Sequence, residues 1–216
     1  MMRLFALASC IGMVAFASAN AQEFPKYTFE IGAGYTTPVG SVGPFLNEGW
    51  NLRAGVGGNF NAHLGAMVNV GYDSIGVNNA TLGNIGFGNG HVDVFHATVD
   101  PVVHLTPRSH LDFYLTGGGG LFHMYETFGS PETISSASTS YATGNVPLLG
   151  FYPGNYGGSQ TLSNYSVNKP GFDVGGGVAI GAFGHGKFFA EARWDHMFMN
   201  NGAHLDFLPV SFGFRW

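Results

Sequence analysis

Residues 188–198 read FFAEARWDHMF, and the order of these side chains decides the fold. Uncharged residues occupy every even position from Phe188 to Phe198. The charged residues Glu191, Arg193 and Asp195 occupy odd positions between them. A period of two is the period of a β-strand, whereas an amphipathic helix repeats every three to four residues. The segment therefore predicts a strand with one uncharged face and one ionic face.

The same alternation occurs in seven further segments. The predicted strands span 27–35, 50–60, 64–72, 93–104, 111–121, 172–182, 188–198 and 208–216. The fourth is the least regular, because Pro101 cannot donate to a ladder and Val102-Val103 breaks the alternation. We expect a β-bulge near Pro101 to accommodate both features.

Charge and glycine share the opposite face of these strands. In a soluble sheet this face would carry long Lys and Glu side chains toward water, but here it is small and rich in glycine. The pattern fits a transmembrane barrel with apolar side chains toward lipid and a narrow ionic lumen. A soluble ligand-binding barrel of the lipocalin kind, with the apolar face inward, is the alternative that periodicity alone leaves open.

The composition agrees with a membrane barrel. Only 10% of the 216 residues are charged, against about 25% in an ordinary soluble domain. The 20 Phe and 9 Tyr residues argue against a disordered chain, which would lack aromatic side chains. A formal net charge of -5 argues against a nucleic-acid partner, because such proteins neutralise phosphates with Lys and Arg.

The first residues resemble an export signal. A basic start at Met1–Arg3 precedes an apolar run at Leu4–Phe16 and a small-residue site at 19–21, which predicts a signal peptide over 1–21 and a single domain over 22–216. A retained transmembrane helix and a lipoprotein signal ending at Cys10 are the alternatives. Cleavage after residue 21 removes the only cysteine, and with it any disulfide or thiolate chemistry.

The connections between the predicted strands alternate in length. Short links fall at 61–63, 106–109 and 184–186, and longer ones at 37–49, 76–91, 127–169 and 199–204. An even number of strands places both chain ends on the side of the short links. We therefore predict an all-β fold, an eight-stranded antiparallel transmembrane β-barrel with short periplasmic turns and longer extracellular loops.

The last strand carries a family resemblance. Residues 208–216 read LPVSFGFRW, with apolar residues on alternate positions and an aromatic terminus: Leu208, Val210, Phe212, Phe214 and Trp216. This resembles the assembly signal of the small outer-membrane β-barrel proteins of Gram-negative bacteria, of the OmpA/OmpX type. The resemblance implies location in the cell outer membrane, contact with its lipids and lipopolysaccharide, and recognition by the barrel-assembly machinery. Pro209 departs from an ideal ladder because it lacks an N–H.

The charged residues of the lumen face form the candidate site. Four of them are expected at similar depth, with Ser211 between them: Glu30, Arg53, Glu191 and Arg193. Asp195 is the fifth member of the predicted network. The family resemblance implies a network that plugs the interior, since charge in a narrow lumen must be paired or hydrated. The alternative is a gate, in which the pairs exchange partners and open a small passive pore.

We assign no catalytic, cofactor or metal site from the sequence. The nine His residues fall mostly at predicted strand ends and lack the spacing of a helix-borne zinc site. Ser109-His110-x-Asp112 could act on lipid A, but it falls in a predicted periplasmic turn. Gly117–Gly120 lacks the following helix and Lys-Ser/Thr of a phosphate loop. These features favour a non-enzymatic protein.

The segment 127–169 is the predicted long loop. It is rich in Ser, Thr, Asn, Gly and Tyr, and its only charges are Glu132 and Lys169. Loops of this length without secondary structure are usually functional or mobile. We expect a monomer with a structural or surface-interaction role, in which this loop adheres to a surface or binds a ligand. The alternative is a flexible loop with no dedicated partner.

Overall fold

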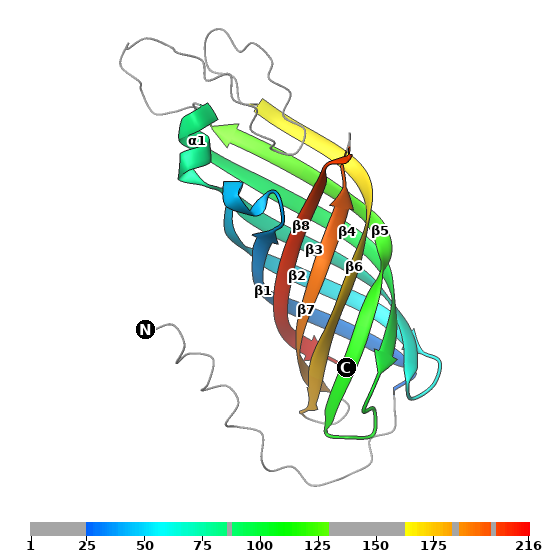
Figure 1. The fold of residues 1–216 in the computed structure, drawn as a ribbon. Helices are drawn as coiled ribbons and strands as arrows, with labels where there is room; N and C mark the ends of the chain where they lie inside the picture. The colour runs from blue at the N-terminus through cyan, green and yellow to red at the C-terminus, as the bar shows by residue number, and fades with distance from the viewer. Residues whose placement is uncertain (1–24, 86–87, 130–162, 183–185, 200–201) are drawn as a thin grey trace, which may run out of the picture.

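Eight antiparallel strands in the described part of the chain close into a barrel in sequence order (Figure 1). The computed structural model describes residues 25–85, 88–129, 163–182, 186–199 and 202–216. The strands are β1 (Tyr27–Val39), β2 (Leu46–Asn59), β3 (Leu64–Val77), β4 (Asn89–His104), β5 (Leu111–Gly129), β6 (Ser163–Gly181), β7 (Lys187–Phe198) and β8 (His204–Arg215). The first and last strands pair from Glu30 opposite Arg215 to Val39 opposite Asp206. The predicted fold class is confirmed.

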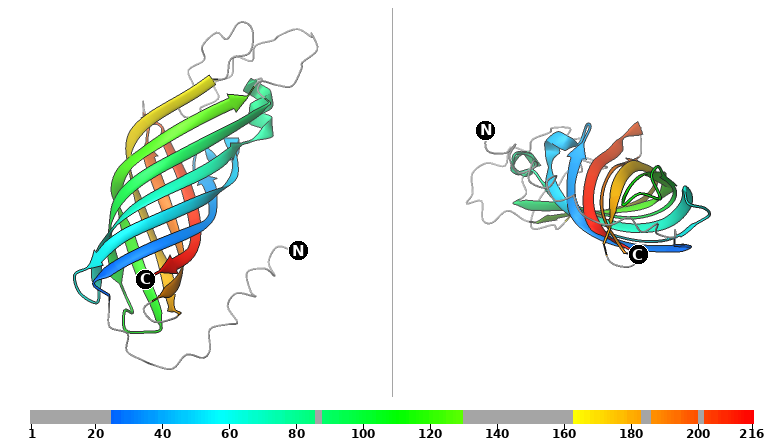
Figure 2. Two further views of the ribbon diagram at one scale, coloured as in Figure 1. Left: turned by 180° about the vertical axis from the view of Figure 1, so that it is seen from behind. Right: turned by 90° about the horizontal axis from the view of Figure 1, so that it is seen from below.

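The strands are tilted, and the view from below shows a closed ring (Figure 2). The end of the barrel near Trp216 carries the short turns, which we call the turn end. The opposite loop end carries a 3₁₀ turn at Gly43–Phe45 and the short helix α1 (Asn79–Ile85). No helix among the described residues is long and apolar enough to cross a membrane.

The two prolines leave the strand register unbroken, so the expected bulge near Pro101 is wrong. The pairing of β3 with β4 passes through Pro101 without a shift, and the pairing of β4 with β5 keeps one register on both sides of it. Val102 interrupts the sequence alternation because it is an apolar residue that points into the lumen, where it is buried. In β8, Pro209 stands opposite Thr36 of β1 in a continuous register.

The hairpin strands continue into the predicted long loop. β5 extends to Gly129 and β6 begins at Ser163, so 127–129 and 163–169 are strand rather than loop. The alternation of apolar residues ends before the strands do, because the outward positions beyond the membrane need not be apolar. The rest of the loop, 130–162, and the predicted signal peptide, 1–21, lie outside the described residues.

The apolar face of the strands is the outer wall. Tyr27 and Ile31 are 64% and 51% exposed, and the outward positions of the other strands follow the same pattern. The lipocalin alternative is wrong, because it would bury these side chains around a ligand. An exposed apolar surface that surrounds the whole barrel is the surface of a protein that spans a membrane.

A belt of aromatic residues marks the edge of this wall nearest the loop end. Neighbouring members contact each other across strands: the rings of Trp50 and Tyr72 are tilted with centroids 5.3 Å apart, and those of Phe172 and Trp194 meet edge-on with centroids 5.6 Å apart. We call this belt the loop-side girdle: Tyr35, Trp50, Tyr72, Phe95, Phe172 and Trp194. Beyond it, outward positions of β4 and β5 are held by Asp93 and His123. The membrane-spanning segments therefore end at the girdle.

Candidate functional site in the barrel lumen

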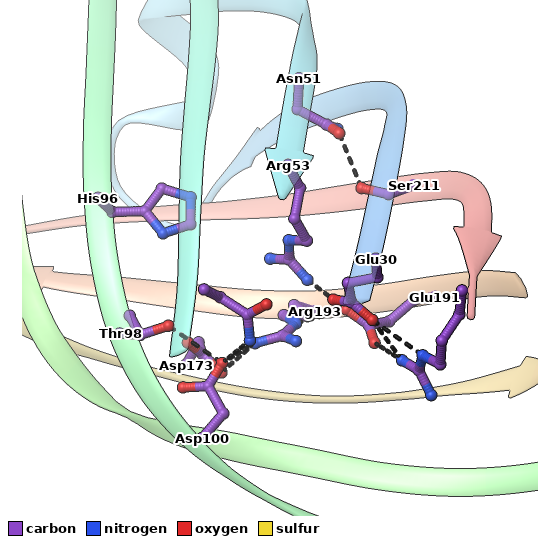
Figure 3. Close-up of polar contacts among 12 residues, drawn as sticks. Glu30, Asn51, Arg53, His96, Thr98, Asp100, Asp173, Glu191, Arg193 and Ser211 are labelled. Atoms are coloured by element: carbon purple, nitrogen blue, oxygen red, sulfur yellow. Dashed lines mark hydrogen bonds and ion pairs between the residues drawn. The ribbon is translucent and has the colours of Figure 1, made fainter. Parts of the chain in front are cut away.

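Arg193 of β7 lies at the centre of the lumen and contacts three carboxylates (Figure 3). Its Nη1 donates to Asp100 Oδ2 at 2.5 Å and to Asp173 Oδ1 at 3.0 Å. Its Nε donates to Glu191 Oε1 at 2.5 Å. The guanidinium is planar and its N–H donors have fixed directions. Carboxylates from three strands meet these donors around one buried cation. This arrangement joins β4, β6 and β7 across the interior.

Two further arginines extend this network toward the turn end. Arg53 of β2 forms an ion pair with Glu191, so that this carboxylate is shared by two guanidinium groups. Arg215 donates from Nε and Nη2 to Glu30 Oε2 at 3.0 and 2.6 Å. We call the complete set the ion-pair layer: Glu30, Arg53, Asp100, Asp173, Glu191, Arg193 and Arg215.

Neutral groups and glycines hold the ion-pair layer in place. Asn69 and Thr98 donate to Asp100 at 2.6 and 3.0 Å. A Cβ at Gly175 would lie 2.7 Å from Arg193 Cγ, so a larger residue there would displace the arginine. Glycine on the lumen face therefore supplies the space that the long charged side chains fill.

A second group lies at the level of the loop-side girdle. Asp73, His96 and Asp195 each follow a girdle aromatic in sequence and point into the lumen. Their potential ligand atoms lie within 4.8 Å of one another. We call this the aspartate–histidine group. Figure 3 shows His96 beside the ion-pair layer, with no drawn contact to it.

Above this level apolar side chains fill most of the lumen. Thirteen buried side chains pack together among the described residues, and we call them the loop-side apolar cluster: Val42, Leu46, Ile75, Val77, Leu82, Val92, Val94, Phe122, Met124, Phe128, Met197, Leu205 and Phe207. Phe122 meets Phe207 edge-on from the facing strand β8, with centroids 6.5 Å apart. Apolar side chains, rather than ion pairs, fill the interior here.

Glu126 of β5 points into the lumen between two members of this cluster, Met124 and Phe128. It is fully buried, and neither carboxylate oxygen has a hydrogen-bond partner in the described part of the chain. It lies beyond the loop-side girdle and thus outside the membrane-spanning segments. Burial raises the pKa of Glu126 to about 7, because a carboxylate is poorly solvated among apolar side chains.

At the turn end, the residues of the Ser109-His110-x-Asp112 motif do not converge. Ser109 and His110 are exposed in the turn, and Ser109 Oγ accepts a hydrogen bond from the Leu111 amide at 3.3 Å. Asp112 instead points into the lumen, where its Oδ2 lies 2.6 Å from Nδ1 of His104. The motif therefore lacks the nucleophile–base contact that hydrolysis requires.

The structure brings together most, but not all, of the predicted site residues. Glu30, Arg53, Glu191 and Arg193 belong to the ion-pair layer, whereas Asp195 lies with His96 and Asp73 nearer the loop end. Ser211 donates to Asn51 rather than to a charged residue, at 2.7 Å.

The candidate set named from the sequence left out three members of the ion-pair layer, and sequence reasoning missed the apolar cluster. Asp100, Asp173 and Arg215 complete the ion-pair layer. The sequence does contain a signal that could have identified lumen residues. The residue that follows each aromatic of the loop-side girdle faces inward. The partners themselves are set by which strands face each other across the barrel, which no local pattern reports.

Solved structures share this architecture. Neisserial surface protein A aligns with 14% identity over 88% of this chain and 96% of that chain, at a TM-score of 0.54. A major outer membrane protein from Thermus thermophilus aligns with 11% identity over 88% and 98%, at 0.57. Ail, the attachment invasion locus protein of Yersinia pestis, aligns with 14% identity over 89% and 100%, at 0.49.

No family model matches the sequence, and no curated protein does. At these identities the solved structures establish the fold. The chain is an eight-stranded outer-membrane β-barrel, the class that its terminal strand predicts. The fold and the apolar wall together place it in a bacterial outer membrane.

Proposed function

We propose that this protein is a non-enzymatic outer-membrane barrel with a closed lumen, which acts as a structural and surface-interaction protein. The observation that carries the proposal is that two different barriers lie in series along the lumen. The ion-pair layer holds β1, β2, β4, β6, β7 and β8 together by charge, and the loop-side apolar cluster fills the interior beyond it.

The two barriers oppose conduction in different ways. Buried ion pairs that include Arg193 would have to separate before water or ions could pass, and an unpartnered buried charge costs several kcal/mol, on the order of 3–5. The thirteen members of the apolar cluster are apolar and solvate a passing ion poorly, and Glu126 is a buried carboxyl group that points in among them. A gate formed by partner exchange in the ion-pair layer alone would leave the apolar cluster shut.

A surface role is favoured by the shape of the loop end. β5 and β6 each have 19 residues, against 12 in β7 and β8, and their hairpin rises beyond those strands (Figure 1). Their outward residues above the girdle include His123 and Asn168, which are joined by a 2.8 Å hydrogen bond. The strand ends that bear the sequence 130–162 therefore lie beyond the membrane surface.

Planar-bilayer recording tests the closed lumen. We expect the folded protein to give no steady single-channel conductance, and we expect Arg53→Ala to be equally silent because the apolar cluster remains. Lys26→Ala, at an exposed position near the turn end, is the matched control. Steps of uniform conductance in the parent protein that change in Arg53→Ala and persist in Lys26→Ala would instead establish a gated pore.

The surface role is tested separately on bacteria. Residues 133–160 are replaced by a Gly-Ser linker of equal length, and heat-modifiable gel migration verifies that the barrel has folded. We expect the replacement to lower adhesion to epithelial monolayers, with the parent protein as reference. Unchanged adhesion and serum survival would remove the surface-interaction role. A changed lipid A acylation pattern on expression of the parent protein would contradict the non-enzymatic assignment.

A further inference from the structure

The aspartate–histidine group presents buried oxygen and nitrogen atoms that have no hydrogen-bond partner among the described residues. Asp195 has no exposed surface, and neither of its carboxylate oxygens has a hydrogen-bond partner within the described residues. Asp73 Oδ2 and His96 Nδ1 are also without one there. An isolated buried carboxylate is costly unless it is paired, protonated or bound to a cation.

The geometry points to a cation between these side chains. His96 Nε2 lies 3.4 Å from Asp73 Oδ2, and the ligand atoms of all three residues lie within 4.8 Å of one another. The three residues come from β3, β4 and β7, so the site exists only in the closed barrel. We propose that Asp73, His96 and Asp195 bind a divalent transition-metal ion.

The ligand chemistry selects the class of ion. Ca²⁺ and Mg²⁺ prefer oxygen ligands alone, whereas an imidazole nitrogen with two carboxylates suits Zn²⁺ and related first-row ions. A neutral imidazole and two carboxylates carry two negative charges, which one divalent ion balances.

The charge of the lumen as a whole favours the same ion. Among the described residues, eight buried carboxylates point inward against four buried Lys and Arg side chains: Glu30, Asp73, Asp100, Asp112, Glu126, Asp173, Glu191 and Asp195 against Arg53, Lys187, Arg193 and Arg215. The cationic groups are concentrated in the ion-pair layer and at the turn end. A divalent ion at the girdle level offsets part of the remaining negative charge where arginine makes no ion pair with these aspartates.

Neighbouring residues hold the ligands in position. Thr36 Oγ1 donates to Asp73 Oδ1, which leaves Oδ2 directed at His96. The His96 ring stacks on Phe122, with centroids 5.2 Å apart and planes at 13°. Gly71 makes room for this ring, because a Cβ there would overlap His96 Nε2. Such outer contacts orient metal ligands and tune affinity.

The position of the site determines how the ion enters. The loop-side apolar cluster covers it on one side and the ion-pair layer on the other. An ion would therefore bind as the barrel closes and exchange slowly afterwards. The site does not depend on the surface-interaction role or on whether the lumen conducts.

The test measures metal retained by the full-length mature chain. The protein is refolded into detergent with one equivalent of Zn²⁺, passed through EDTA and a desalting column, and analysed by mass spectrometry for zinc. We expect about one zinc ion per folded chain and a higher urea midpoint than in protein refolded with EDTA. Refolding with Co²⁺ gives a visible spectrum that reports nitrogen and oxygen ligands.

Matched variants locate the ion. Asp195→Asn and His96→Gln should lose the retained zinc and the zinc-dependent stabilisation, and Thr36→Val should weaken zinc affinity about 10-fold or more. His104→Gln, at another buried lumen histidine, should retain zinc. His196 and His204 contact Asp206 on the outer wall, which is a second place where zinc could bind. The double variant His196→Gln/His204→Gln should therefore also retain zinc.

The zinc measurement on the parent protein tests the proposal even if a variant fails to fold. Absence of retained zinc and an unchanged urea midpoint would overturn the proposal, and Asp195 would then be a buried neutral acid. Zinc retained equally by Asp195→Asn and His96→Gln, or lost only in the outer-wall double variant, would also overturn it.

Discussion

At the residue scale, the lumen satisfies most of its charges through shared partners. Glu191 accepts from both Arg53 and Arg193, and Arg193 also reaches Asp100 and Asp173. Shared partners allow a few arginines to serve several strands, and Arg53 and Arg193 join parts of the sheet that make no backbone contact. Carboxylates outside this pairing are therefore informative. Among the described residues, Asp195 and Glu126 have no hydrogen-bond partner at either carboxylate oxygen.

Glu126 predicts a pH dependence of stability. The pKa of a free glutamate side chain is near 4.5, and burial raises the pKa of Glu126 to about 7 in the fold. Between these values the folded state keeps a proton that the unfolded state releases. Stability should fall as pH rises through this interval, and the loss should be complete above pH 7.

We therefore expect Glu126→Gln to stabilise the barrel at pH 8, by up to roughly 3 kcal/mol, and to have little effect at pH 4. Urea titrations in lipid vesicles at the two pH values measure this difference. Glu48→Gln, at an exposed position toward the same end, is the control. A Glu126→Gln gain that is equal at both pH values would contradict the explanation.

At the element scale, close contact between strands explains three of the four consecutive glycines of β5, namely Gly117, Gly118 and Gly120. In β5, a Cβ at Gly120 would overlap the carbonyl oxygen of Ala97 in β4. A Cβ at the adjacent Gly119 would instead meet the carbonyl oxygen of Gly171 at an ordinary 3.5 Å. Adjacent glycines of one strand thus have different structural requirements.

These two neighbours provide a matched comparison. Gly120→Ala should lower the free energy of unfolding by about 1–3 kcal/mol, because β4 and β5 would have to move apart. Gly119→Ala should be close to neutral. The urea midpoint and the fraction of heat-modifiable protein measure both variants, and equal effects of the two substitutions would refute a role for strand contact.

At the scale of the whole molecule, the barrel has an apolar outside and an interior divided by depth. From the turn end the lumen contains the ion-pair layer, then the aspartate–histidine group, then the loop-side apolar cluster. The outer wall changes from apolar to polar at the loop-side girdle. Contact with the membrane therefore determines which residues lie on the outer wall, whereas side-chain packing and ion pairing determine which residues lie in the lumen.

The outer wall predicts a depth-dependent response to charge. Ile31 and Thr37 both face outward from β1, with Ile31 inside the apolar wall and Thr37 beyond Tyr35 of the girdle. We expect Ile31→Arg to destabilise the barrel in lipid vesicles by about 2–4 kcal/mol and Thr37→Arg by about 1 or less. Unfolding free energies in vesicles measure both, and similar costs would argue against the assigned membrane boundary.

The sequence by itself determined the barrel and which residues of each strand share a face. The physical reason is that a strand exposes alternate residues to opposite faces, so a local period of two carries this information. The small, glycine-rich and charged character of one face then indicated that the other face meets lipid. The sequence also placed Glu30, Arg53, Glu191 and Arg193 on the lumen face. The expectation of a bulge at Pro101 was wrong, because the strand register is continuous there. Val102 is apolar and faces inward, so it interrupts the alternation of apolar and polar residues without interrupting the strand.

Only the tertiary structure decided which lumen residues meet. Arg193 binds Asp100, which is 93 residues away in sequence, and His96 lies beside Asp195 rather than beside a neighbour in the chain. The apolar cluster likewise depends on strands from both halves of the chain facing each other. Contacts across a barrel depend on strand register and on closure between β1 and β8, which are properties of the whole sheet.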